Sequence, residues 1–161
     1  MRGDHGPLHD EVATPDWLFE KLDEEFHFTW DVAASRDLHR CEGYYTEEDD
    51  ALGRPWDGEV CWCNPPFSEA AKWADKAVAE ARAGATVVMV INTIRVFGWS
   101  SATVLKRFDK AELRIIPGRA RFRRVNGDAV ELPVCVAILR PGLPGPGSIG
   151  LWTGDWAKVR T

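Results

Sequence analysis

The sequence has no run of about 18 apolar residues, so no membrane-spanning helix is expected. Residues 1–5 are polar and no apolar segment follows them, so we expect no secretory signal. Paired CxxC spacing is also missing, and the four histidines form no ligand pattern, so we expect no metal site. Cys61 and Cys63 lie two apart on an expected strand and share one face, which is typical of buried, reduced thiols.

The composition is that of an ordinary globular protein of one domain. Of its 161 residues, 45% are hydrophobic and 28% are charged, and a chain of this length can bury a sizeable core. Seven of the ten residues in 141–150 are proline or glycine, which indicates that the core has ended. We therefore expect a flexible N-terminus over 1–11, a single domain over 12–140, and a Pro/Gly-rich C-terminal tail over 141–161.

The net charge of −5 is unevenly distributed. Residues 1–60 hold 17 acidic and 5 basic side chains, whereas residues 61–161 hold 8 acidic and 15 basic ones. Such asymmetry is a hint of nucleic-acid contact, although a solvated basic face explains it equally well. The basic side chains concentrate in one stretch: Lys106, Arg107, Lys110, Arg114, Arg119, Arg121, Arg123 and Arg124.

Helical and strand patterns alternate along the chain. We expect helices over 15–26, from Ser68 as its cap to Gly84, and near 100–108, and strands over 28–32, 59–63, 85–91, 110–116 and 133–139. This order predicts a three-layer α/β/α fold whose mostly parallel sheet is pared down and ends in an antiparallel pair. Asp31 and Asn64 both follow predicted strands, and ligands of such folds bind at the strands' carboxyl ends.

The turn Asn64-Pro65-Pro66-Phe67 carries the most specific chemistry. The prolines fix φ near −65° and hold the turn rigid, so the Asn64 side-chain oxygen and the Pro65 carbonyl can aim at one point. Two acceptors there would bind both hydrogens of an exocyclic amino group, while Phe67 offers a flat face to the attached ring. The alternative is that Asn-Pro-Pro is simply a good turn.

Several segments in fixed order resemble the small phage-type DNA N6-adenine methyltransferases, a Dam-like family. The similar segments span roughly 12–141 and comprise 14–19, 31–35, 45–52 with Trp56, 62–67, 84–89, 117–122 and the strand at 133–139. The resemblance implies a Rossmann-like methyltransferase fold and S-adenosylmethionine as methyl donor.

The resemblance also implies the donor site. Thr14 and Pro15 would help to hold the donor's methionine end, Asp31 would accept from its ammonium or ribose, and Ala33 belongs to the same site. Asp50 would accept from the donor's adenine, with Asp49 as the alternative. Taken alone, these residues also fit a helix start, a strand-end cap and a solvated acidic loop.

The implied reaction is methyl transfer to N6 of an adenine flipped out of double-stranded DNA. Asn64, Pro65, Pro66 and Phe67 would be catalytic, and Arg119, Arg121, Arg123 and Arg124 would bind DNA. No separate recognition domain fits in the length, so the recognised site should be short. A cytoplasmic location is expected, in the bacterial host of a phage or prophage.

Two features depart from the family pattern. The first strand's turn has no glycine-rich loop, and Asn92-Thr93-Ile94-Arg95 follows the strand at 85–91 in place of a Pro-Ala-type turn. Protein glutamine N5 methylation, RNA adenine methylation and a catalytically silent nucleic-acid-binding protein remain as alternatives.

Overall fold

A computed structural model describes residues 12–97, 102–124 and 126–152. The elements follow one another as β1 (Val12–Ala13), α1 (Asp16–Phe26), β2 (Trp30–Asp31), β3 (Gly43–Tyr44), β4 (Val60–Cys63), α2 (Ala70–Arg82), β5 (Thr86–Asn92), α3 (Thr93–Phe97), α4 (Ala102–Leu105), β6 (Glu112–Ile115), β7 (Ala120–Arg124), β8 (Ala129–Leu132), β9 (Val134–Leu139) and β10 (Ser148–Leu151). Short 3₁₀ turns lie at Glu47–Asp49, Ala51–Gly53, Phe67–Glu69 and Lys106–Phe108.

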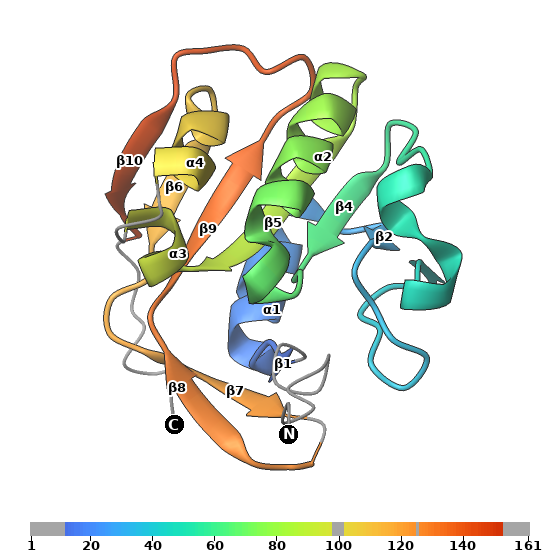
Figure 1. Ribbon diagram of the computed structural model, residues 1–161, viewed down its shortest axis with the longest axis vertical. Coiled ribbons are helices and arrows are strands. Elements are labelled where there is room, and N and C mark those ends of the chain that lie inside the picture. Colours follow the sequence, from blue (N-terminus) through green and yellow to red (C-terminus); the bar gives the residue numbers. More distant parts are fainter. Residues whose placement is uncertain (1–11, 98–101, 125, 153–161) are drawn as a thin grey trace, which may run out of the picture.

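The main sheet has the strand order β10-β6-β9-β5-β4-β2-β3. All neighbouring pairs are parallel except those made by β9, which runs antiparallel to both β5 and β6. The mostly parallel sheet is therefore confirmed, and β6 and β9 form the expected antiparallel pair. The sheet does not end in that pair, because β10 adds a parallel strand beyond β6. It is also pared down, because β2 and β3 are joined without a helix (Figure 1).

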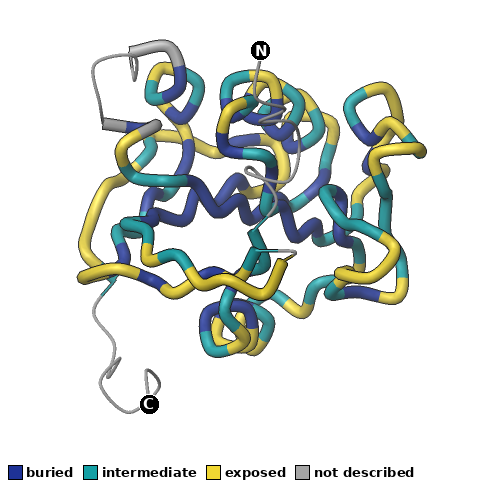
Figure 2. Tube along the Cα trace, turned by 60° about the horizontal axis from the view of Figure 1, so that its bottom comes forward, coloured by how far each residue is buried: buried dark blue, intermediate teal, exposed yellow. Residues whose placement is uncertain are grey.

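Helices cover both faces of this sheet, as the continuous apolar run of β5 requires. Val87, Met89 and Ile91 pack into one core cluster with α2, α3 and α4, whereas Val88 and Val90 pack into a second cluster with α1. In Figure 1 α2 lies in front of the sheet and α1 behind it. The buried strands form the dark centre of Figure 2, between half-buried and exposed outer segments. The three-layer arrangement is confirmed.

Helix α1 is amphipathic as predicted. Leu18 and Leu22 are fully buried, and burial of each such side chain stabilises the fold by about 1.5–3 kcal/mol. The helix begins at Asp16 with Pro15 as its N-cap, one residue later than expected, and no side chain caps it.

A second sheet of three strands, β1-β7-β8, lies at the carboxyl end of β4 and β5, at the bottom of Figure 1. Strand β7 alternates strictly, with Ala120 and Phe122 buried and Arg121 and Arg123 exposed. Strand β1 pairs with β7, so Val12 and Ala13 lie beside Arg124 and Arg123.

Two local expectations were wrong. Ser68 does not cap α2, because the chain makes a 3₁₀ turn over Phe67–Glu69 first and Glu69 becomes the N-cap. The core also does not end at residue 140, because Leu143 is buried and β10 extends the sheet by pairing with β6. The high glycine and proline content had suggested a segment outside the core, but the backbone of 148–151 forms hydrogen bonds with β6. The expected N-terminal segment 1–11 and the end of the tail from 153 lie outside the described residues.

Within the part of the chain that the structure describes, no helix is long and apolar enough to cross a membrane.

Candidate active site

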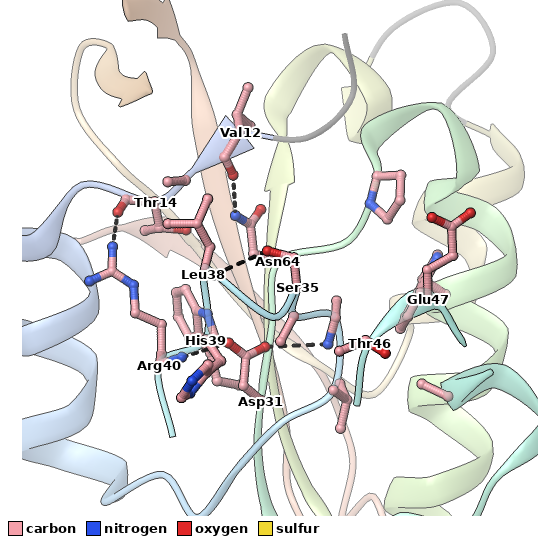
Figure 3. Close-up of a pocket in the computed structure, with 18 of the residues that line it drawn as sticks. Val12, Thr14, Asp31, Ser35, Leu38, His39, Arg40, Thr46, Glu47 and Asn64 are labelled. Atoms are coloured by element: carbon pink, nitrogen blue, oxygen red, sulfur yellow. Dashed lines mark hydrogen bonds between the residues drawn. The ribbon is translucent and has the colours of Figure 1, made fainter. Parts of the chain in front are cut away.

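A cavity of about 1200 Å³ opens at the carboxyl ends of β2 and β4. The chain leaves β2 toward β3 on one side and returns to β4 on the other, so the strand order reverses between them. Ligands of open α/β sheets bind at such a reversal. Asp31 closes β2 and Asn64 directly follows β4, so the fold brings both into one cavity (Figure 3).

The amide of Asn64 is held in one orientation. Its Nδ2 donates to the carbonyl oxygen of Val12 at 2.7 Å, a contact that only the nitrogen end of the amide can make. The other end, Oδ1, is buried and has no hydrogen-bond partner among the described residues. An unsatisfied buried acceptor costs about 1–3 kcal/mol, so its presence needs an explanation. An unmet acceptor in a cavity is suited to a donor from a bound molecule.

The rest of the turn differs from its expected arrangement. Pro66 lines the cavity, whereas Pro65 is buried beneath it. Phe67 is only 8% exposed and packs edge-on against Phe122, with ring centroids 6.0 Å apart. The ring therefore belongs mostly to the core and does not present an open face to the cavity.

Asp31 is a buried carboxylate at the end of the neighbouring strand β2. It is 3% exposed and accepts from the backbone N–H groups of Arg40 at 2.9 Å and of Ala33 at 3.3 Å. Burial raises the pKa of Asp31 to about 6, against the lowering effect of these hydrogen bonds and of the Arg40 charge. Thr14 lines the same cavity, and its buried hydroxyl oxygen has no hydrogen-bond partner in the part of the chain that the structure describes. Thr14, Pro15, Asp31 and Ala33 thus line one cavity.

The two candidate aspartates of the acidic loop, Asp49 and Asp50, have different surroundings. Asp50 lines the cavity in a left-handed conformation, with φ of 54°. Asp49 instead turns its carboxylate to Thr46, where it accepts from the backbone N–H at 2.8 Å and the hydroxyl at 3.0 Å. These bonds lower the pKa of Asp49. The carboxylate of Asp49 thus holds the turn, and Asp50 faces the cavity.

The four arginines proposed for DNA binding are not equivalent. Arg121 and Arg123 are exposed and line the cavity. Arg119 precedes β7 and does not line it, and Arg124 is half-buried on the other side of the strand. Within the described ranges, no carboxylate lies within salt-bridge distance of Arg121 or Arg123.

With this geometry in view, the comparisons with known proteins become informative. Residues 5–134 match the family described as DNA N-6-adenine-methyltransferase (Dam). The chain belongs to this family. A DNA N-6-adenine-methyltransferase of Haemophilus phage HP1 (strain HP1c1) is 31% identical over 86 residues, which are 52% of this chain and 50% of that protein. The chain therefore spans about half the length of this curated relative of the Dam family.

The structure of this Dam family member adds cavity residues that the sequence did not indicate. Ser35, Leu38, His39 and Arg40 come from the loop between β2 and β3 (Figure 3). His39 stacks on Tyr44 with ring centroids 4.0 Å apart. The loop has no apolar period and no motif, so no local signal could have placed it over the cavity.

The cysteines play no part in this Dam family site. All four are unpaired and buried, as predicted for structural thiols, and burial raises the pKa of Cys61 and Cys135 to about 12. No group of three or more histidine, cysteine or acidic side chains in the described ranges could hold a metal ion.

Proposed function

We propose that this chain is an S-adenosylmethionine-dependent methyltransferase with a Rossmann-like fold, and that it methylates N6 of an adenine flipped out of double-stranded DNA. One observation carries the proposal. In a member of the Dam family, the Asn64 Oδ1 is a buried acceptor that has no partner within the described ranges, in the cavity where the strand order reverses.

Asn64 acts on the amino group of the target base. Its Oδ1 accepts one amino hydrogen. The Pro65 ring is buried beneath the cavity, so this residue can contribute only its backbone carbonyl, which accepts the other hydrogen. The two bonds concentrate the nitrogen lone pair on the side that faces the methyl group. Transfer then depends on orientation, which can supply roughly 7–11 kcal/mol of the barrier. The methylated nitrogen becomes acidic and releases its proton afterwards, so no general base is needed before attack.

The part of the cavity formed by the end of β2 and the start of α1 fits the donor. A buried carboxylate at Asp31 suits an ammonium or ribose hydroxyl, and the unpartnered Thr14 hydroxyl offers a further polar contact. The uncapped start of α1 at Pro15 suits a carboxylate, and Ala33 and Asp50 also line the cavity. Bound there, S-adenosylmethionine supplies a methyl group on a positively charged sulfur.

We expect DNA to bind where the exposed arginines of β7 lie, at the rim of the cavity. Flipping an adenine costs a few kcal/mol, and phosphate contacts offset part of this cost. Arg121 and Arg123, at the rim of the cavity, hold the backbone beside the flipped nucleotide, while Arg119 and Arg124 contribute less. Phe67 contacts the base only with the small exposed part of its ring, which Phe122 holds in place.

The test is modified-base mass spectrometry of DNA from cells that express the chain and lack adenine methylation of their own. We expect N6-methyladenine with the wild-type chain and none with Asn64→Ala at equal expression. Digestion with methylation-sensitive nucleases then locates the site. A methyl mark on cytosine, on RNA adenine or on protein glutamine, with none on DNA adenine, would overturn the proposal.

A further inference from the structure

Arg40 joins two walls of the cavity. Its backbone N–H donates to Asp31 Oδ2 at 2.9 Å, which holds the carboxylate at the end of β2. Its guanidinium reaches the start of α1, where Nη1 donates to Asp16 Oδ1 at 2.6 Å and Nη2 donates to the carbonyl oxygen of Thr14. The guanidinium also lies over the Phe19 ring, 5.2 Å from its centroid.

The segment that Arg40 grips also orients Asn64. Two residues before Thr14, the Val12 carbonyl accepts the Asn64 Nδ2 hydrogen at 2.7 Å, the contact that leaves Oδ1 without a partner. Figure 3 shows both contacts on the same short stretch of chain. Strand β1 is only two residues long, so few bonds of its own fix its position.

The same segment contacts the basic strand. In β1, Val12 pairs with Arg124 and Ala13 pairs with Arg123 of β7. Residues 12–16 therefore contact three parts of the site. Arg40 links them to Asp31, the Val12 carbonyl accepts from the Asn64 amide, and Ala13 pairs with Arg123 of β7. A shift of this segment would reach all three.

We propose that Arg40 is a positioning residue, which fixes residues 12–16 and through the Val12 carbonyl sets the orientation of the Asn64 amide. Its effect on methyl transfer rests on the proposed function, but its effect on Asn64 does not. Without the Arg40 side chain, Thr14 and Asp16 lose their tie to the β2–β3 loop, and the Val12 carbonyl is held less firmly. The Asn64 amide can then rotate and present either end to the cavity.

The direct readout is the side-chain amide resonance of Asn64 in the NMR spectrum, assigned by its absence in Asn64→Asp. In Arg40→Ala we expect it to shift toward the position of an amide without a protein partner, and Arg40→Lys should restore it in part. Arg36→Ala is the matched control. Arg36 lies on the same loop, bonds to Glu48 at 2.9 Å and does not line the cavity.

A second variant keeps the test decisive if Arg40→Ala fails to fold. Asp16 has an exposed carboxylate bonded to Arg40, so Asp16→Ala should loosen the same grip and shift the Asn64 resonance in the same direction. The exposed Glu20 on α1 supplies the control, Glu20→Ala. An unchanged Asn64 resonance in both Asp16→Ala and any folded Arg40 variant would overturn the proposal.

Kinetics separate this role from simple donor binding. At saturating S-adenosylmethionine and DNA, Arg40→Ala should lower kcat roughly tenfold to a hundredfold, since small misplacements of a reacting group have effects of this size. A raised KM with unchanged kcat would show that Arg40 only holds the donor, and would contradict the positioning role. If the wild-type chain transfers no methyl group to adenine, the proposed function fails, and the NMR readout still decides the role of Arg40.

Discussion

Arg114 and the pair Arg121 and Arg123, from neighbouring stretches of this chain, have opposite surroundings. Arg114, on β6, donates to both carboxylate oxygens of Glu25 at 2.7 and 2.8 Å and also bonds to Glu112. It is 14% exposed, and its pKa is raised by these partners. Arg121 and Arg123 lie on β7, seven and nine residues further on, exposed and without a carboxylate partner in the described ranges.

The surroundings of each arginine indicate whether it stabilises the fold or is available to bind a ligand. A guanidinium that already donates to two carboxylates stabilises the fold, and it has few free hydrogen-bond donors for a phosphate. An exposed guanidinium at the rim of a cavity is available to a ligand. The same distinction separates Asp49, which is bonded to Thr46, from Asp50, and it marks the open acceptor of Asn64. Among the described residues, six buried side-chain polar atoms have no hydrogen-bond partner, and three of them belong to the cavity-lining residues Thr14, Asn64 and Trp73.

The largest expected effect comes from removing the open acceptor. Asn64→Ala should reduce methyl transfer by about 10²–10³-fold, the size seen when one preorganised polar contact to a reacting group is lost. Its free energy of unfolding should change little, because the loss of the bond to the Val12 carbonyl is offset by removal of a buried polar atom that has no partner among the described residues. Parallel transfer assays and denaturant unfolding measure both. Asn64→Asp, which keeps an acceptor but loses the donor to Val12, should retain more activity than Asn64→Ala.

The buried carboxylate of Asp31 should make stability depend on pH. Because its pKa is raised to about 6 from 3.8, the folded chain binds this proton more tightly than the unfolded chain. The stability it confers is full below pH 3.8, falls as pH rises toward about 6, and is constant above, a change of roughly 3 kcal/mol. Asp31→Asn should remove this slope in unfolding experiments between pH 4 and 7. Asp37→Asn, an exposed change on the following loop, should preserve it.

The paired arginine should affect the fold and not the reaction. Arg114→Ala should lower the free energy of unfolding by about 1.5–3 kcal/mol, the usual contribution of hydrogen bonds to charged groups. Methyl transfer per folded molecule should remain at the wild-type rate. Lys110→Ala, at an exposed residue of the same basic stretch, should leave stability unchanged. A lower rate of methyl transfer per folded molecule in Arg114→Ala would contradict the distinction between Arg114 and the exposed arginines.

The smallest effect belongs to the exposed pair. Each phosphate contact contributes about −0.9 to the log–log slope of affinity against salt, so replacing Arg121 and Arg123 by Ala should flatten that slope by about two units. Affinity should fall alike for target and non-target DNA. Arg119→Ala, outside the cavity, should have less effect on the slope. A collapse of discrimination between the two DNAs would indicate that one of the pair contacts a base edge.

Much of this arrangement could be predicted from local patterns. The alternation of helices and strands, with a strand over 85–91, predicted the layers, and the ends of two strands placed Asp31 and Asn64 at one edge. What could not be predicted depends on contacts between distant residues. The bond between Val12 and Asn64 spans 52 positions, and β1 is too short to have a periodic pattern.

The remaining differences have the same origin. Arg40 contacts Thr14 and Asp16 across more than twenty residues, and nothing in its neighbours marks it. The partners of β10 and the burial of Phe67 against Phe122 likewise arise from tertiary packing and not from local propensity. Charge counts alone could not separate Arg114 from Arg121, because the separation depends on which side chains lie within reach.

The most direct test of this division follows Asn64→Ala and Arg114→Ala side by side. Both purified variants would receive S-adenosylmethionine with a labelled methyl group and unmethylated duplex DNA, with label in N6-methyladenine counted per folded molecule. The account predicts wild-type transfer by Arg114→Ala, and a loss of about 10²-fold or more in Asn64→Ala, which keeps wild-type stability. Substantial transfer by Asn64→Ala, or an equal loss in both variants, would contradict it.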